Sequence, residues 1–327
     1  MHNKWIVLAA IAGLTVNGLT AETASAQAYP VRPIRMVVGF SPGGPADVMA
    51  RLIGQRMAVS LGQPIVVENR AGAGGTIAAR VVAESEPDGY TLLLGNTSTL
   101  VISPLMYKNV GYDALKAFAP IARLGTTSDI LVVDPKFPAQ TLAELIAYAK
   151  ANPGKLNYST PGIGTPPHLI GEMLKLRAGV EIVHVPYKSG GQSIQAVVAG
   201  EVQFTFENPA VALPLVQAGV VRALAVTSAA RHPQAPDVPT LVEAGLPGFV
   251  SVSFTGVVGR AGIPGPVVGK LNSAINESLQ SPEVAATLAK LAVDVGGGTP
   301  AEFAAFLSEE MTTMKPVIKA AGLQGVE

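Results

Sequence analysis

One segment of the chain has the residue types and spacing of a nucleophilic serine. Gly39-Phe-Ser41-Pro-Gly43 fits the pattern G-x-S-x-G between an apolar run and a helical pattern, as in serine hydrolases. Those enzymes stabilise the reacting oxyanion partly with the backbone N–H of the residue after the serine, and Pro42 has no N–H. No credible triad includes any of the histidines His168, His184 and His232. We therefore expect no catalytic residues, and an exported hydrolase that uses Ser41 is kept as the alternative.

The same turn suits the capture of an anion by backbone amides. Two glycines let the backbone approach a ligand closely, and Pro45 stands at a first helical position. Free N–H groups and the positive end of the helix dipole then point at the loop, so a carboxylate can be held without arginine. A tight turn and helix cap with no ligand would use the same residues. The candidate ligand contacts in this segment are Phe40, Ser41, Gly43, Gly44, Ala46 and Asp47.

A second turn of this kind runs from Thr160 to His168. Gly162 and Gly164 open the turn, and Thr165 offers an N-cap hydroxyl before two prolines. His168 falls in the first helical turn with Glu172 four residues later, but two ligands do not make a zinc site and the chain has no cysteine. We expect ligand contacts from Thr160, Gly162, Gly164, Thr165 and His168, and no metal.

Three further loops carry candidate contacts. Polar residues end the third predicted strand, where the carboxyl ends of parallel strands line a binding crevice. Tyr187 can wall a pocket while its hydroxyl bonds a polar group, and Lys188 is a basic residue beside it, or a solvated surface charge. Glu207 can bond a donor on the ligand or stabilise the helix that follows. The candidates are Asn96, Thr97, Ser98, Tyr187, Lys188, Glu207 and Asn208.

These residues need a scaffold of alternating strands and helices. Apolar runs predict strands at 34–40, 64–69, 90–95, 129–134, 155–159, 180–185, 202–207, 222–227 and 252–259. Helical patterns lie between them at 47–60, 76–84, 141–151, 167–177, 192–199 and 209–218, and the end of the chain is helical, with prolines at 264, 282 and 300 near three helix starts. The alternation predicts an α/β fold of two lobes, each a mainly parallel sheet flanked by helices, with a hinged cleft between them.

The lobes and the leader can be placed along the chain. We expect residues 28–127 plus 252–327 to form lobe 1 and residues 128–251 to form lobe 2. Lys4, an apolar run at 5–16 and Ala24-Ser25-Ala26 have the pattern of a secretory signal peptide spanning 1–26, cleaved after Ala26. The run of about 12 residues is too short to cross a membrane. We therefore expect a periplasmic protein.

Composition excludes several classes of partner and cofactor. Lysine plus arginine equals aspartate plus glutamate at 23 each, so no basic excess favours nucleic acid. Gly72-Ala-Gly74-Gly75 is half of a dinucleotide fingerprint and lacks the third glycine, since Ile77 holds that position. We expect no cofactor and a monomer.

Taken together, the segments resemble the substrate-binding receptors of tripartite tricarboxylate transporters, the Bug-type periplasmic receptors. The likeness is carried by Tyr29-Pro30, Pro33-Ile34-Arg35, PGGPAD, GQPIVVENRAGAGG, PDGYTLLLG, FAPIARLG, NYSTPGIGTPPHL, VPYKSGGQS, RALAVTS and PDVPTLVEAGLPGF. Three departures from the family pattern are Gly39 for a usual proline, Ala46 for a frequent threonine, and Glu207-Asn208 in the later loop.

The resemblance implies two α/β domains that close on a ligand in the cleft. It implies that Ser41 to Asp47 and Thr160 to His168 hold a carboxylate through backbone amides and waters, and that Tyr187 to Gly190 closes the pocket. The partners would be a small carboxylated ligand, such as a di- or tricarboxylate or an aromatic carboxylate like terephthalate, and the membrane subunits of a secondary transporter. A periplasmic ligand sensor has the same sequence features and remains an alternative.

Overall fold

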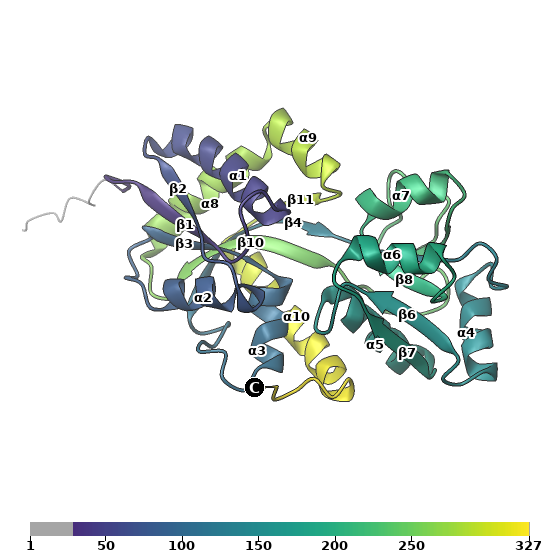
Figure 1. Ribbon diagram of the computed structural model, residues 1–327. Coiled ribbons are helices and arrows are strands. Elements are labelled where there is room, and N and C mark those ends of the chain that lie inside the picture. The colour runs from purple at the N-terminus through teal and green to yellow at the C-terminus, as the bar shows by residue number, and fades with distance from the viewer. Residues whose placement is uncertain (1–28, 327) are drawn as a thin grey trace, which may run out of the picture.

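The computed structural model describes residues 29–326, which form two β-sheets flanked by helices (Figure 1). The predicted signal peptide and its cleavage site lie outside the described residues. The first sheet has six strands in the order β11-β4-β10-β3-β1-β2, and the second has five in the order β7-β6-β8-β5-β9. The two sheets lie side by side in Figure 1, each with its own helices. The predicted α/β class is confirmed.

The strands of the first sheet are β1 (Ile34–Val38), β2 (Ile65–Asn69), β3 (Thr91–Asn96), β4 (Phe118–Thr127), β10 (Ser253–Arg260) and β11 (Asp294–Gly297). Those of the second are β5 (Ile130–Val133), β6 (Leu156–Thr160), β7 (Ile182–Pro186), β8 (Phe204–Glu207) and β9 (Arg222–Val226). Each predicted strand is present with ends shifted by two residues or fewer. Strands β4 and β11 were not predicted, because β4 contains Pro120 and Arg123 and β11 is a short run rich in glycine.

The first sheet is covered by α1 (Pro45–Leu61), α2 (Thr76–Ala83), α3 (Ser103–Met106), α8 (Gly265–Leu279), α9 (Pro282–Lys290) and α10 (Pro300–Ala320). The second carries α4 (Leu142–Ala151), α5 (Pro166–Ala178), α6 (Gly190–Val198) and α7 (Pro209–Gln217). The 3₁₀ turn η1 (Ala73–Gly75) and the π-helical turn η2 (Ser98–Ile102) follow β2 and β3. The three predicted proline starts are confirmed: Pro264 is the N-cap of α8, and α9 and α10 begin at prolines.

Both sheets are mixed, which corrects the expectation of mainly parallel sheets. In the first sheet β1 pairs parallel with β2 and β3, whereas β10 runs antiparallel to β3 and β4. In the second, β6 pairs parallel with β7 and β8, and β5 runs antiparallel to β8 and β9. Two of the antiparallel neighbours, β4 and β10, are the strands by which the chain leaves the first sheet and returns to it.

The two crossings between the sheets are hydrogen-bonded to each other. The outward crossing is Ser128–Asp129, and the return crossing leaves β9 at Thr227. The Asp129 N–H donates to Thr227 Oγ1 at 2.8 Å, and the Thr227 N–H donates to the Asp129 carbonyl at 2.9 Å. The Ser251 N–H donates to the Thr227 carbonyl at 2.9 Å. We propose 28–127 plus 252–327 and 128–251 as the two lobes because they lie on either side of these crossings.

The strands of the first sheet bury side chains on both faces. Ile34, Met36 and Val38 of β1 pack with α1 and α8, and Val37 points to the opposite layer with α2 and α10. Helix α10 also packs against α5, so this second layer continues into the second sheet. The rigid core therefore ends at the carboxyl ends of the strands, where the loops begin.

Candidate ligand-binding site

The predicted site segments all lie at the carboxyl ends of strands. Strands β1 and β3 end beside each other in the first sheet, and β6, β7 and β8 end together in the second, because the strands of each group are parallel. Each of the loops 39–44, 161–165 and 187–189 then leads into a helix, α1, α5 or α6. The two sheets therefore each present one row of loop–helix entrances.

A cavity of about 130 Å³ lies between the end of β3, the crossings and the start of α5. Its lining includes three predicted residues of lobe 1, Asn96 to Ser98, and also Pro166, the first residue of α5 in the second lobe. Thr127 at the end of β4 and Ser253 and Thr255 of β10 complete the wall, and none of the three was among the predicted contacts. The lining residues are Asn96, Thr97, Ser98, Thr127, Pro166, Ser253, Phe254 and Thr255.

Two residues of this wall also hold the local backbone. Asn96 Oδ1 accepts from the Thr99 N–H at 3.0 Å and from its hydroxyl at 3.1 Å. The buried Thr97 Oγ1 accepts from the Phe254 N–H at 2.8 Å, which ties the end of β3 to the start of β10. Hydroxyl and amide groups are thereby placed in fixed positions on the cavity wall.

The carboxylate of Asp47 is used within the first turn. It accepts the Gly43 N–H at 2.9 Å, the Asn69 Nδ2 at 2.9 Å and the Arg51 Nε at 3.0 Å. The Arg51 bond, then the Gly43 bond, lower the pKa of Asp47 to about 2. The Gly43 amide is therefore used inside the turn, and in the first turn of α1 the N–H groups of Ala46 and Asp47 have no acceptor within residues 29–326.

The other predicted contacts in this turn differ in exposure. Ser41 and Gly43 are exposed, and Gly44 is the partly buried N-cap of α1. The ring of Phe40 is partly buried beside the first core, and its carbonyl accepts from Asn69 Nδ2 at 3.0 Å. Ser41 thus stands at the surface of the loop, and no hydrogen bond joins its hydroxyl to a histidine in the described part of the chain.

The second turn uses most of its amides internally, which corrects the expectation of an amide-rich entrance. The Gly162 N–H donates to Thr160 Oγ1 at 3.2 Å, and the Gly164 N–H donates to His168 Nδ1 at 3.1 Å. The Thr165 hydroxyl donates to the Gly162 carbonyl at 2.7 Å and makes no N-cap bond. Because Pro166 and its neighbour begin α5 without N–H groups, this helix offers its dipole but few donors.

The side chain of His168 is buried and pairs with that of His184, which is half-buried. Its ring stacks on that of His184 with centroids 3.9 Å apart, and His184 Nε2 lies 2.6 Å from Thr160 Oγ1. His168 is 5 % exposed, and burial lowers the pKa of both rings, that of His184 to about 4. The neutral imidazole rings of His168 and His184 therefore hold the Thr160–His168 turn in place through their stacking and hydrogen bonds.

The entrance to α6 keeps its backbone donors free. Ser189 Oγ caps the helix by accepting from the Gln192 N–H at 3.3 Å, while the N–H groups of Gly190 and Gly191 have no acceptor in the described chain. Lys188 is exposed. The hydroxyl of Tyr187 donates to Glu201 at 3.0 Å, which leaves its oxygen able to accept a hydrogen bond.

The end of β8 places a buried acid beside this entrance. Glu207 is 6 % exposed, and burial raises its pKa. Asn208 caps α7, with Oδ1 accepting from the Ala210 N–H at 2.8 Å, so its side chain serves the helix rather than a ligand. A second buried acid, Asp129, lies at the crossing and was not among the predicted residues. Burial, and then the charge of Glu207, raise the pKa of Asp129 to about 7.

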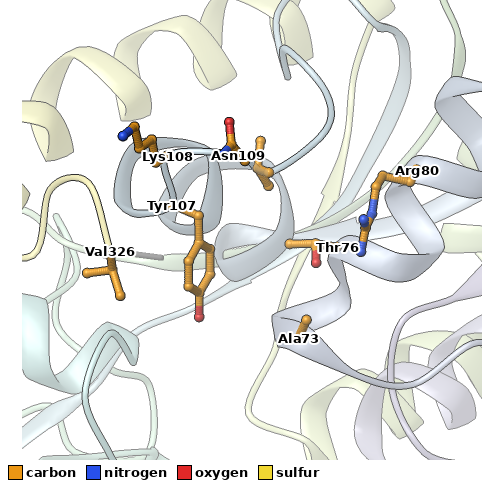
Figure 2. Close-up of a pocket in the computed structure, with 8 residues that line it drawn as sticks. Ala73, Thr76, Arg80, Tyr107, Lys108, Asn109 and Val326 are labelled. Atoms are coloured by element: carbon orange, nitrogen blue, oxygen red, sulfur yellow. The ribbon is translucent and has the colours of Figure 1, made fainter.

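A second, larger cavity is lined by none of the predicted residues. It measures about 500 Å³ and lies between η1, α2, the end of α3 and the last residues of the chain. Figure 2 shows the Tyr107 ring between Val326 and Thr76, while the Lys108 side chain points the other way. Arg80 is the other cation on its wall. It is set apart from the wall of the smaller cavity, with which it shares no residue.

Two classes of site have no support in the described residues. Within 29–326 no three His, Cys, Asp or Glu side chains are grouped as metal ligands would be. None of the helices in the same range is both long and apolar enough to span a membrane. The features that remain are two rows of loop–helix entrances and a polar cavity between the lobes.

A family model described as the tripartite tricarboxylate transporter family receptor matches residues 49–323. The chain belongs to this receptor family. BugT of Bordetella pertussis is 36% identical over 321 residues, covering 98% of both chains. The receptors of the family are periplasmic.

Solved structures agree with this assignment and with the predicted two-lobed fold. A Rhodopseudomonas palustris protein solved with adipate is 34% identical, with a TM-score of 0.75 and coverage of 91% of this chain and 100% of that chain. MatC of the same species, solved with bound malate, is 35% identical, with a TM-score of 0.71 and coverage of 89% and 100%. The two-lobed periplasmic-binding-protein fold is confirmed.

Proposed function

We propose that this receptor captures a small carboxylate between its lobes and delivers it to the membrane subunits of a tripartite tricarboxylate-type transporter. The observation that carries the proposal is the polar cavity, whose wall joins Asn96 to Ser98 of one lobe to Pro166 of the other. A ligand there touches both lobes, so it favours the arrangement in which they meet. Two similar proteins solved with adipate and malate support a carboxylate.

The carboxylate would be held by main-chain donors rather than by an ion pair. The free N–H groups are those of Ala46 and Asp47 at α1 and of Gly190 and Gly191 at α6. Directed amide dipoles at helix starts bind anions without a cationic side chain. The predicted contacts remain our proposed site. They are the turns at 40–47 and 160–168 together with Asn96, Thr97, Ser98, Tyr187, Lys188, Glu207 and Asn208.

Catalysis has less support than binding. A hydrolase would need Ser41 to meet a base, yet His168 is bonded to Gly164 and stacked on His184. The residue after Ser41 is proline, which removes one oxyanion donor. We therefore propose a monomeric, periplasmic binding protein without enzymatic activity or cofactor, whose leader is cleaved after Ala26. A sensor that presents the same ligand to a membrane partner would use the same site.

A thermal-shift screen of di-, tri- and aromatic carboxylates tests the proposal. Ligand at 100 times its dissociation constant adds about 2.7 kcal/mol to the free energy of unfolding. We expect one strong hit in the panel, with its dissociation constant then measured by calorimetry. A flat response across the whole panel would reject carboxylate capture. Loss of ester hydrolysis in purified Ser41→Ala, if the parent protein hydrolysed esters, would favour the enzyme instead.

A further inference from the structure

The cavity of about 500 Å³ beside α2 has no role in the proposed function, yet it is large enough for a small molecule. Ligand pockets in proteins commonly measure about 300–1,000 Å³. Its walls come from the turn that leads into α2, the loop after α3 and the last described residue of the chain. The turn is the glycine-rich segment 72–75, whose resemblance to half of a dinucleotide pattern the proposed function leaves unexplained.

Two donors on the cavity wall have no partner in the described chain. Thr76 is 4 % exposed, and its hydroxyl makes no hydrogen bond within residues 29–326. The guanidinium of Arg80 makes neither a hydrogen bond nor a salt bridge in the same range. Side-chain polar atoms of buried residues are nearly always hydrogen-bonded, so the Thr76 hydroxyl calls for a partner from the cavity side.

Helical spacing places these two donors on one face of α2. Arg80 follows Thr76 by four residues, a spacing at which Cβ atoms lie about 5–6 Å apart. In Figure 2 the guanidinium and the hydroxyl extend towards the same side of the cavity. A Cβ at Gly111, which has φ +86°, would lie 2.6 Å from Arg80 Cδ, so only glycine leaves room there for the arginine stem. The stem is therefore packed in place with its charged end at the cavity.

The rest of the wall is mostly apolar. Ala73, Val110 and Val326 line it, and the ring of Tyr107 lies between Val326 and Thr76 (Figure 2). A water molecule takes about 30 Å³ of liquid volume, so an isolated oxyanion would fill only a small part of this cavity. A ligand that matches the whole wall therefore needs an apolar body attached to its charged group.

Backbone hydrogen bonds hold the two sides of the cavity. The Val326 N–H donates to the Met106 carbonyl at 3.0 Å, and the Lys108 N–H donates to the Val326 carbonyl at 3.1 Å. On the other side the Thr76 N–H donates to the Ala73 carbonyl. Walls that are ordered before a ligand arrives lose little entropy when it binds.

We infer that this cavity is a second binding site, which takes an oxyanion, either a carboxylate or a phosphate ester, joined to an aromatic or aliphatic body. The Arg80 guanidinium can bond two oxygens of such a group at once, and the Thr76 hydroxyl can donate to the same group. The side chain of Lys108 points the other way in Figure 2, so Arg80 supplies the charge. Because the two cavities share no lining residue, this site is independent of the proposed function.

The competing explanation is a surface hollow that holds only water. Water can bond the Thr76 hydroxyl and solvate the Arg80 guanidinium without any selectivity for a ligand. Four compounds separate the two explanations. Phenyl phosphate and benzoate carry both a ring and an oxyanion, whereas benzyl alcohol has the ring without the charge and inorganic phosphate has the charge without the ring.

Calorimetry with these four compounds tests the inference on the purified protein. We expect phenyl phosphate or benzoate to bind, and benzyl alcohol and inorganic phosphate to bind at least about tenfold more weakly. The tighter of the first two identifies the charged group as phosphate or carboxylate. Arg80→Gln shortens the side chain and removes its charge, so it should weaken binding about 10- to 100-fold. Thr76→Val should weaken it about two- to tenfold without lowering the free energy of unfolding of the unliganded protein, because its hydroxyl has no partner in the described chain.

Arg177→Gln is the matched control, since Arg177 is exposed in the last turn of α5, in the second lobe, and has no salt bridge within residues 29–326. It should bind the probe as tightly as the parent protein does. Arg80→Gln should also keep its affinity for the best carboxylate of the thermal-shift screen, which separates this site from the cleft. No binding of phenyl phosphate or benzoate would overturn the second site, as would binding that neither Arg80→Gln nor Thr76→Val weakens. Benzyl alcohol binding as tightly as both anions would overturn the assignment of an oxyanion.

Discussion

Alanine at Gly164 tests whether the geometry of the second turn controls binding. Gly164 has φ +73°, a conformation that costs a residue with a Cβ about 1–2 kcal/mol. The added Cβ would also lie 2.8 Å from the Sδ and Cε atoms of Met106, which belongs to α3 of the first lobe. The substitution therefore strains the turn and pushes against the opposite lobe.

Gly43→Ala separates these two effects. Gly43 has φ +79°, but a Cβ there would meet no atom within 4 Å. Gly43→Ala should therefore show only the cost of the left-handed backbone conformation, about 1–2 kcal/mol. This cost is divided between the free energy of unfolding and the free energy of binding. If the whole cost falls on binding, affinity drops about 5- to 30-fold. Gly164→Ala should cost more in total because of the Met106 contact.

Lys188→Ala supplies the comparison with side-chain charge. Lys188 is exposed, and within residues 29–326 no salt bridge includes it. An exposed charge of this kind is worth roughly 0–1 kcal/mol, so binding should weaken by about fivefold at most. The assay is calorimetry with the best carboxylate from the screen, together with chemical unfolding of each variant without ligand.

The ranking decides whether backbone approach or charge holds the anion. We expect Gly164→Ala to weaken binding most, then Gly43→Ala, then Lys188→Ala. A double-mutant cycle of Gly164→Ala with Met106→Ala should show coupling, because truncating Met106 removes the contact across the lobes. A larger loss from Lys188→Ala than from both glycine variants would refute the reasoning.

Three further outcomes follow from buried contacts. Asp47→Asn should lower the free energy of unfolding by about 1–3 kcal/mol in urea titrations, because its carboxylate accepts from Gly43, Arg51 and Asn69, and an unchanged value would contradict this role. Thr97→Val should cost about 1–3 kcal/mol in the same assay by leaving the Phe254 N–H unpaired, whereas Thr97→Ser should not. Folding lowers the pKa of His184 from about 6.5 to about 4, so the neutral ring contributes to the free energy of unfolding above pH 6.5 and this contribution is lost as the pH falls towards 4. The difference in free energy of unfolding between the parent protein and His184→Gln should therefore shrink over that range. A difference that stays constant would rule out this titration.

The scaffold was predictable because each buried strand is a short apolar run between turn residues. Ile34–Val38 is an example, and it precedes a glycine-containing turn. Strand β4 was not predictable in the same way, since Pro120 interrupts its pattern and its pairing with β10 is irregular there. The antiparallel pairs also depend on where the chain crosses between sheets, which local patterns do not contain.

The sequence predicts where the candidate turns lie, but not which of their N–H groups are free. Turn residues indicate where a backbone can approach a ligand, yet the acceptor of each N–H is set by side-chain placement. The role of Asp47 could have been predicted from the sequence. Asp47 is the third residue of α1, where an acidic side chain commonly accepts from the N–H groups just before the helix. Asp129 had no such local signal, because its burial arises from the crossing and from β8, which lies far along the chain.

Free main-chain donors are unevenly distributed among the helix entrances. In the first lobe α1 offers the N–H groups of Ala46 and Asp47, while in the second the prolines at the start of α5 remove donors and the glycines at α6 supply them. An acid group that needs several amides is therefore better matched to α1 and α6 than to α5. The α5 entrance then acts through its position on the cavity wall at Pro166 and through its dipole.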